Sequence, residues 1–221
     1  GDRTRVLKHG DTFAVFDHNG DIVSGAGSPE GLYHRDARHL SHLRLSISGT
    51  RPMLLSSTLR DDNATLTCDL TNPDIYDGGH LLLGHDRVHL RRSKFLWNAT
   101  CFERIAIRNF DERRQWMRLE LDFAADFADL FEVRGARRAR RGTMQEAKLE
   151  PAAVTLVYTG LDAQQRRTRL RFEPAPTRLA SGRAEFDFDL DPHQQTAVFV
   201  EVRCDAAVPD RPPRGLFFAC L

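Results

Sequence analysis

The sequence has almost no net charge and lacks the short motifs that identify cofactor-binding proteins. Its 221 residues include 32 lysines and arginines against 31 aspartates and glutamates, so the formal charge at pH 7 is +1. This balance argues against a polybasic nucleic-acid-binding chain and against an acidic solvating tail. The glycine-rich dinucleotide loop, the phosphate-binding loop and the HExxH and CxxC zinc patterns are all missing. We therefore expect no nucleic-acid partner, no cofactor and no metal site.

Long hydrophobic runs are missing as well. The longest segment without a charged residue, 151–161, contains threonine, tyrosine and glycine, whereas a membrane-spanning helix needs about 20 apolar residues. No apolar stretch follows the charged N-terminus in the manner of a signal peptide. Three of the four widely spaced cysteines, Cys68, Cys101 and Cys204, fall in apolar or alternating runs, where buried free thiols are expected. These absences predict a cytoplasmic protein without a membrane partner.

What the sequence does have is a period of two in its hydrophobic residues. Apolar side chains alternate with mostly polar ones in five segments, 43–48, 116–123, 154–159, 183–190 and 197–204. Successive side chains of a β-strand point to opposite faces, so each segment is expected to form a strand with one core face and one wetter face. In the fourth segment this pattern predicts that Phe186 and Phe188 lie in the core.

Turn residues separate the strand-like segments. The pair Asn19–Gly20, between 13–16 and 22–23, predicts a tight β-hairpin. Residues 48–52 separate two further strand candidates, and 126–131 fit either one helical turn or a bulged strand. No amphipathic stripe of three or more helical turns is evident. The pattern therefore predicts an all-β, mainly antiparallel fold, a large β-sandwich of the supersandwich type with little helix.

The C-terminal end differs in composition from the rest of the chain. Residues 1–207 hold the strand-like segments and are predicted to form the β-sandwich domain. Residues 208–215 are rich in proline and arginine, which is typical of a linker, and the last six residues are apolar. An exposed apolar run favours association. The segment 208–221 therefore either folds back onto the sandwich or leads to a domain that this chain lacks, and we favour the second interpretation.

Four motifs stand in order along the chain, at Gly31–Leu40, Leu54–Ser57, Leu70–Asp74 and Ala125–Gly135. With them the chain, over roughly residues 5–205, resembles the N-terminal domain of bacterial glycogen-debranching proteins of the amylo-α-1,6-glucosidase type. The resemblance implies a β-sandwich placed before a helical α/α barrel that carries the glycosidase acids. That barrel is not in this chain, and no pair among its acids is singled out by spacing. We therefore expect no catalytic residue here, although the parent protein resembles a glycoside hydrolase.

The first motif contains side chains that are suited to sugar recognition. Arg35, Asp36 and Arg38 carry planar groups that can hold hydroxyls through paired hydrogen bonds. An Arg–Asp network that fixes the loop is the competing interpretation, and we favour it. We expect Asp36 to act as a scaffold, and Arg35 and Arg38 to take part in recognition as well.

The third and fourth motifs supply further binding candidates. Asn72 and Asp74 are first of all turn residues, because their side chains bond nearby backbone and the proline between them fixes φ; ligand binding is the second interpretation. Glu132 and Arg134 are two apart in a strand-like run, which puts them on one face, close enough to pair. Five arginines between 134 and 141 form either a solvated loop or a contact with an acidic neighbour domain or a phosphate.

These observations support three hypotheses. The leading one is a non-catalytic N-terminal β-sandwich domain that supports the catalytic α/α barrel of a glycogen-debranching glycosidase and contacts α-glucan or an oligosaccharide. A stand-alone carbohydrate-binding module and a structural interaction domain of another enzyme are the alternatives. An exposed aromatic platform on a sheet face would favour the module, but the sequence does not place Trp97 and Trp116 relative to such a face.

Overall fold

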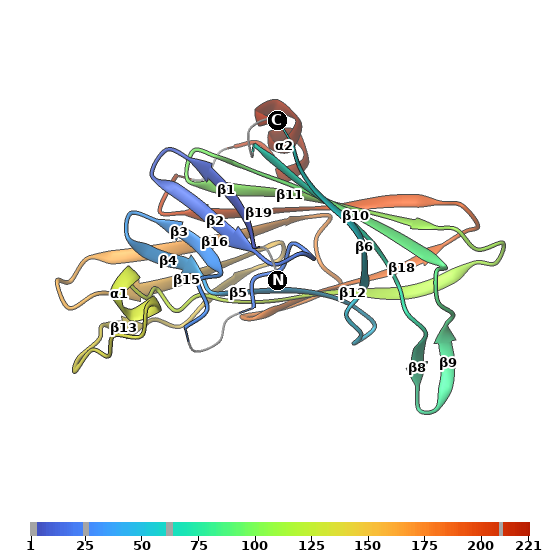
Figure 1. Cartoon of the computed structure of the whole chain (residues 1–221), viewed down its shortest axis with the longest axis horizontal. Helices are drawn as coiled ribbons and strands as arrows, with labels where there is room; N and C mark the ends of the chain where they lie inside the picture. The colour runs from blue at the N-terminus through green and yellow to red at the C-terminus, as the bar shows by residue number, and fades with distance from the viewer. Residues whose placement is uncertain (1–3, 24–26, 61–63, 208–209) are drawn as a thin grey trace.

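The structure, a computed structural model, describes residues 4–23, 27–60, 64–207 and 210–221 and consists almost entirely of antiparallel β-strands. The strands form two broad layers with the hydrophobic core between them (Figure 1). The predicted all-β sandwich with little helix is confirmed.

The larger layer is a nine-stranded sheet. Its strands follow the order β13–β15–β16–β19–β11–β10–β7–β6, and β14 pairs with β15 outside this path. Their bounds are β6 (Met53–Arg60), β7 (Thr65–Thr71), β10 (Val88–Trp97), β11 (Thr100–Asn109), β13 (Thr143–Met144), β14 (Lys148–Glu150), β15 (Ala153–Thr159), β16 (Gln165–Glu173) and β19 (Gln195–Cys204).

A four-stranded sheet lies across the core from it, in the order β17–β18–β12–β5. Its strands are β5 (His42–Ile47), β12 (Gln115–Ala124), β17 (Arg178–Ala180) and β18 (Arg183–Leu190). The ring centroid of Phe172, on β16, lies 6.1 Å from that of Phe123 on β12 and 6.0 Å from that of Phe186 on β18. The two sheets therefore share one core, as the alternating segments predict.

The alternating segments bury the expected side chains on the core face of the sheets, but part of the face expected to be wetter is buried as well. Phe186 is buried as predicted, whereas Phe188 is only half-buried. On β19 the face expected to be wetter is buried too: Phe199 and Glu201 are at most 3% exposed. The C-terminal helix α2 (Pro213–Cys220) and the residues before it lie on this face and exclude water from it.

The C-terminal helix packs against the outer face of the nine-stranded sheet. Phe217 of α2 is buried in a cluster with Phe95, Phe102 and Phe199, and the backbone N–H of Arg214 donates to Glu173 Oε2 at 2.8 Å. Of the two interpretations of the apolar tail, folding back onto the sandwich is the one that the structure shows. That a further domain follows stays a prediction.

A third, smaller sheet is built from the N-terminal strands β1 (Arg5–His9), β2 (Thr12–Phe16), β3 (Gly31–His34) and β4 (Ala37–Leu40). The tight turn predicted after β2 is present, since Asp17 N donates to Asp21 O at 2.8 Å. Its second arm does not pair with β2, however, because Ile22 exchanges backbone hydrogen bonds with Leu43 of β5. The predicted hairpin is therefore wrong: the turn carries the chain from the small sheet to the four-stranded sheet.

One hairpin projects from the sandwich (Figure 1). It is formed by β8 (Ile75–Asp77) and β9 (His80–Leu83), which pair only with each other. The connecting Gly78–Gly79 has φ values of +56° and +85°, a conformation that glycine adopts without strain and that a two-residue hairpin loop requires. Ile75 and Leu83, at the base, are part of the core and anchor the hairpin.

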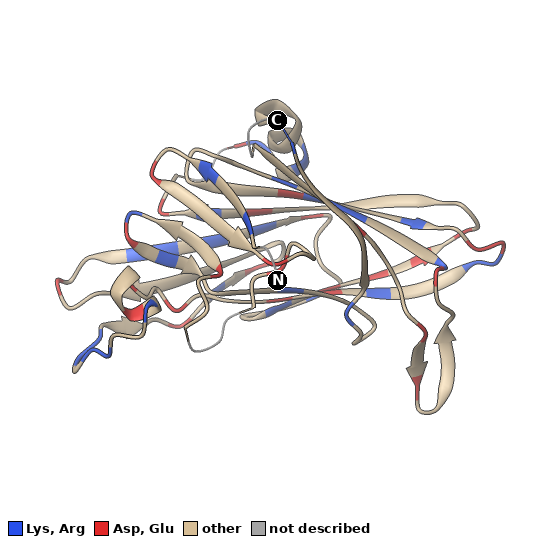
Figure 2. Cartoon of the chain, viewed as in Figure 1, with Lys and Arg blue, Asp and Glu red and all other residues tan. Residues whose placement is uncertain are grey.

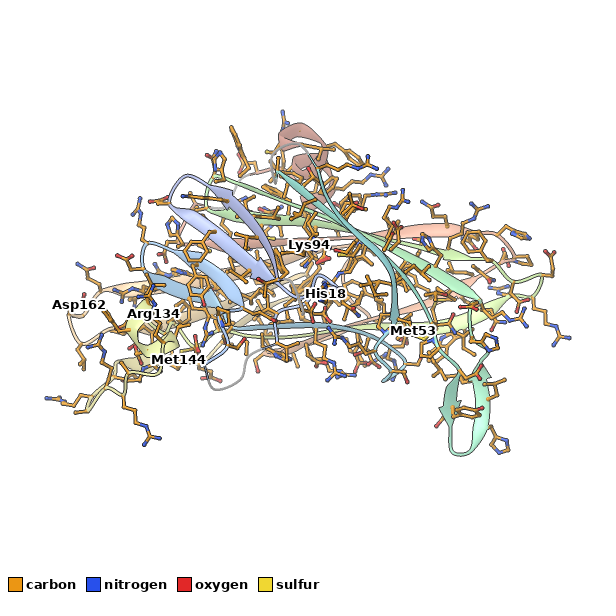
Figure 3. The ribbon with its side chains drawn as sticks, viewed as in Figure 1. His18, Met53, Lys94, Arg134, Met144 and Asp162 are labelled. Atoms are coloured by element: carbon orange, nitrogen blue, oxygen red, sulfur yellow. The ribbon has the colours of Figure 1, made fainter. Side chains whose placement is uncertain are left out.

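A buried ionic network ties the turn after β2 to the nine-stranded sheet. Arg92 Nη1 lies 2.5 Å from Asp21 Oδ1 and Arg92 Nε lies 2.8 Å from Glu103 Oε2. Lys94 Nζ is 3.1 Å from Glu103 Oε1; Figure 3 shows Lys94 between the layers. All four side chains are at most 3% exposed. Burial opposes the charge on Glu103, but the neighbouring Arg92 and Lys94 outweigh it and lower the pKa of Glu103.

Other expectations concern membranes, thiols and metals. No helix in the described part of the chain has the length and apolar composition needed to cross a bilayer. Cys68, Cys101 and Cys204 are buried free thiols, as expected. The described residues include no group of three or more His, Cys, Asp and Glu side chains arranged to hold a metal ion.

Candidate functional site

Three segments that are far apart in the sequence line one cleft at the end of the sandwich. They are the β3–β4 turn (35–37), the region from 127 to 142 with the short helix α1 (Leu130–Val133), and the region from 158 to 166 around the β15–β16 turn. The cleft has a volume of about 410 Å³. Figure 3 shows Arg134 and Asp162, from two of these segments, at the same end of the molecule.

Arg38 fastens the β3–β4 turn to the second segment. Its Nε and Nη2 donate to the two carboxylate oxygens of Asp126, at 3.1 and 2.5 Å. Its Nη1 donates to the carbonyls of Ser28 and Glu30, both at 3.2 Å. Only 8% of the side chain is exposed, and a Cβ on Gly31 would lie 2.5 Å from Arg38 Cδ, so the motif opens with glycine where the arginine passes. Because its guanidinium makes its hydrogen bonds inside the fold, Arg38 fixes the position of the turn. Its burial does not favour a role in sugar recognition.

Arg35 and Asp36 are the exposed residues of the same turn. Both have left-handed backbone conformations, with φ of +47° and +68°. Arg35 Nε donates to Asp11 Oδ2 at 3.1 Å, and this bond holds the pKa of Asp11 below its usual value. Asp36 lines the cleft, and its carboxylate has no partner among the described residues. The expected scaffold role of Asp36 is therefore wrong; Arg38, which is buried, has that role.

Glu132 belongs to the short helix α1, so of the two alternatives for this region, a helical turn or a bulged strand, the helical turn is the one present. Asp129 caps α1: its Oδ1 accepts from Glu132 N at 2.8 Å, and Glu132 Oε1 accepts from Asp129 N at 3.3 Å. The other oxygen of Glu132 pairs with Arg141 Nε at 2.8 Å. Arg134 is the exposed C-cap. The expected Glu132–Arg134 pair is therefore wrong, because residues two apart on a helix do not face each other.

Arginines outnumber acids along the cleft. The charged lining residues are Arg35, Arg138, Arg140, Arg141 and Arg166 against Asp36, Asp129, Glu132 and Asp162. The basic run between 134 and 141 thus supplies three of the five arginines, and Figure 2 shows both charges interspersed at this end. Such a lining can hydrogen-bond hydroxyls or form ion pairs with a polar protein surface.

The electrostatics of Asp129 do not favour a role in acid catalysis. Burial opposes ionisation of Asp129, but hydrogen bonds from the Glu132 N–H and from Arg138 outweigh it and lower the pKa of Asp129. The Arg138 Nη2 atom lies 2.6 Å from Asp129 Oδ2. A general acid in glycoside hydrolysis needs a carboxyl with a raised pKa. Asp129 is shifted in the opposite direction.

Asn72 and Asp74 lie elsewhere, at the base of the β8–β9 hairpin. Asn72 is buried, with Nδ2 donating to Gly84 O at 2.7 Å and Oδ1 accepting from Val88 N at 2.9 Å. Asp74 Oδ1 accepts from His85 Nδ1 and from His85 N, and these bonds lower the pKa of Asp74. The turn interpretation of both residues agrees with these bonds.

The third wall of the cleft was missed by sequence analysis. Asp162 and Arg166 flank the β15–β16 turn, and a Cβ on Gly160 would lie 2.6 Å from Asp162 Oδ1 and 3.0 Å from Arg166 Nη1. Nothing in the local pattern links them to Arg35, because the two turns belong to different sheets and meet only where β16 packs against β4. The charged residues that follow the alternating segment 154–159 were the signal present in the sequence.

A family model for the N-terminal domain of some glycogen debranching enzymes matches residues 7–201. The chain belongs to this family. All three walls of the cleft lie within the matched residues. No curated protein matches the chain significantly.

Solved structures show where this fold recurs. The chain is similar to a structure named "Putative kojibiose phosphorylase from human microbiome", with a TM-score of 0.60 and 9% identity over 90% of this chain. It spans only 29% of that relative's length. A "Putative aldose 1-epimerase" from Escherichia coli K12 gives a TM-score of 0.49 and 10% identity, covering 94% of this chain and 100% of that one. At 9% identity the likeness to the first structure concerns the fold alone.

Proposed function

We propose that this chain is the non-catalytic N-terminal domain of a glycogen-debranching-type glycosidase, where it supports a catalytic α/α barrel and contacts α-glucan. The family match over residues 7–201 is the observation that carries this proposal. The 29% share of the phosphorylase-like relative supports it, because a domain of this kind occupies a minor part of that longer chain.

The cleft is the surface that we assign to the barrel. Its arginines and acids come from turns and a short helix, and Arg35 is 74% exposed. Interfaces between domains of one chain are more polar than permanent ones, and arginine is enriched in them. Interspersed charges of both signs also select one docking orientation.

The non-catalytic role is supported by how the acids are used. Asp129 and Glu132, which line the cleft, are engaged in the α1 cap and in arginine pairs. The pKa of Glu30 is raised by burial, but Glu30 lies outside the cleft lining and accepts a hydrogen bond from Val23 N at 2.8 Å. Hydrolysis by an acid pair needs two carboxyls about 5–10 Å apart across one sugar site, and the acids that act electrostatically on Glu30, Asp17 and Asp21, are both paired with Arg51.

The enzymatic part of the proposal is tested with purified proteins. We expect the chain alone to release no glucose from an α-1,6-branched glucan, and an α/α barrel encoded with it to be active only in its presence. Turnover by the chain alone that disappears when its own carboxylates are replaced would contradict the proposal.

The docking part is tested by charge reversal. Arg35→Glu is expected to weaken association of the chain with the barrel by about tenfold or more. The substitution replaces an exposed cation of the cleft by an anion, which would repel the group on the barrel that pairs with Arg35. The matched control is Arg113→Glu, an exposed arginine in the β11–β12 loop at the opposite end of the molecule (Figure 1). Equal effects of the two substitutions would move the interface away from the cleft.

A further inference from the structure

A second cavity lies on the outer face of the four-stranded sheet. Its volume is about 310 Å³, and three elements contribute to it: the turn after β5, the projecting β8–β9 hairpin and β12. The residues that line it are Ser48, Gly49, Tyr76, Asp77, Leu82, Trp116, Arg118 and Glu120. None of them lines the first cleft, so the two sites are separate.

Two large aromatic residues of this cavity are exposed to solvent. Trp116 is 40% exposed on a strand whose outward positions otherwise carry Arg118, Glu120 and Asp122. Tyr76 is 62% exposed on the hairpin. Exposed aromatic rings contribute nothing to the core of this domain, and they combine an apolar face with a polar edge. Their meeting at one concave surface is the arrangement expected of a ligand site.

The polar groups around the rings are held in place by the sheet. Glu120 Oε2 accepts from Gly49 N at 3.1 Å and lies 2.9 Å from Arg183 Nη2. Arg118 Nε donates to Asp187 Oδ1 at 3.1 Å, and its guanidinium lies 5.5 Å from the centre of the Trp116 ring. Asp77, by contrast, is exposed and has no partner among the described residues. The cavity therefore combines fixed polar groups with a free carboxylate.

The hairpin that supplies Tyr76 and Asp77 is fixed at its base. Asn72 donates to Gly84 O and accepts from Val88 N, and Asp74 accepts from the backbone of His85. These bonds close the neck of the hairpin and fix the direction in which it leaves the sandwich, so Tyr76 and Asp77 line the cavity together with Trp116 of β12. The two motif residues first considered as ligand-binding thus act as positioning residues for this cavity.

We infer that this cavity binds a hexose ring of an α-glucan chain. Trp116 and Tyr76 offer apolar faces to the C–H surfaces of the ring, Asp77 and Glu120 accept hydrogen bonds from its hydroxyls, and Arg118 donates one. The choice of α-glucan as ligand rests on the proposed function. Binding here is independent of the barrel, however, since the cleft assigned to docking shares no residue with this site.

The two tryptophans of the chain allow a direct test. Trp97 is 44% exposed but lies outside this cavity, with its ring tilted against that of His9 and the ring centroids 4.5 Å apart. In Trp97→Phe the remaining indole is in the cavity, and in Trp116→Phe it is outside. Titration with maltoheptaose is expected to change the fluorescence of the first variant saturably and to leave that of the second unchanged. No change in the first variant would overturn the inference.

Affinity measurements by calorimetry complete the test. Trp116→Ala and Tyr76→Ala are each expected to weaken maltoheptaose binding by about tenfold or more, since truncating a central aromatic removes most of the contact. Trp97→Ala is the matched control and should bind as the unchanged chain does. Thermal melts check that the variants remain folded, which the exposure of both residues predicts. Unchanged affinity in both cavity variants, or equally tight binding of a β-linked glucan, would overturn the inference. Arg35→Glu should leave this binding intact, which separates it from the docking proposal.

Discussion

Two ionic networks in this domain use the same chemistry in opposite surroundings. The first joins Arg92 and Lys94 to Asp21 and Glu103 between the layers, and Arg92 is fully buried. The second crosses the outer face of β17, β18 and β12, where Arg178 pairs with Glu185 and with Asp187, but its guanidinium side chain is 46% exposed.

The contrast shows that geometry alone does not rank ion pairs. Both networks have short contacts between guanidinium and carboxylate groups, and in both the pKa of the acid is lowered. Removing one member of the buried network leaves a charge inside without water, which costs several kcal/mol. Removing one member of the exposed network returns its partner to water, which costs little.

The largest expected effect is on the buried network. Glu103→Gln should lower the free energy of unfolding by about 3–5 kcal/mol, because the buried Lys94 then loses its carboxylate partner and the buried Arg92 keeps only Asp21. Chemical denaturation measures it, with Glu185→Gln on the exposed network as the matched control. A loss below about 1 kcal/mol in Glu103→Gln would remove the distinction between the two networks.

An intermediate effect is expected where one partner is buried and the other is not. Arg38 is 8% exposed and Asp126 is 36% exposed. Arg38→Ala should cost about 2–3 kcal/mol, as expected for the loss of hydrogen bonds that involve charged groups. Arg35→Ala, in the same turn, is the control and should cost about 0–1 kcal/mol. Equal melting temperatures for the two variants would contradict the assignment of Arg38 as the brace.

A pH dependence extends the comparison to a single buried group. Burial lowers the pKa of His34 below 6.5, and its Nδ1 lies 2.8 Å from Thr12 Oγ1. As the pH falls, His34 is therefore protonated in the unfolded chain before it is protonated in the folded chain. The stability that the neutral His34 contributes is complete above pH 6.5 and decreases as the pH falls through that value. Melting temperatures at pH 7.5 and pH 5 should differ less in His34→Gln than in the unchanged chain.

The smallest effect is expected for the exposed network. Arg178→Ala should change the free energy of unfolding by about 0–1 kcal/mol, and the change should shrink further in about 1 M salt, where exposed pairs are screened. Denaturation at low and high salt measures both values. A salt-independent loss of several kcal/mol would show that exposure at this site does not weaken the network.

The motif around Arg35 illustrates how far sequence reasoning reached. It identified a loop and the charged residues in it, yet it did not predict the two strands β3 and β4 and it exchanged the roles of Asp36 and Arg38. Their exposure depends on Asp126, which is far away in sequence and meets Arg38 only after β4 and the segment before α1 come together. The Glu132–Arg134 pair failed for a related reason, since the local pattern fitted a strand as well as a helical turn until the Asp129 cap decided it.

The sequence by itself determined the five alternating strands and the layered β-fold, because a period of two along the chain depends only on neighbouring residues and on one buried face. It also contained the family motifs. The tertiary structure alone decided which charges are buried, which turns line the cleft and that Trp116 meets Tyr76 at one cavity. The physical reason is that burial and site geometry are set by contacts between segments far apart in the chain, and these contacts leave no periodic trace in the sequence.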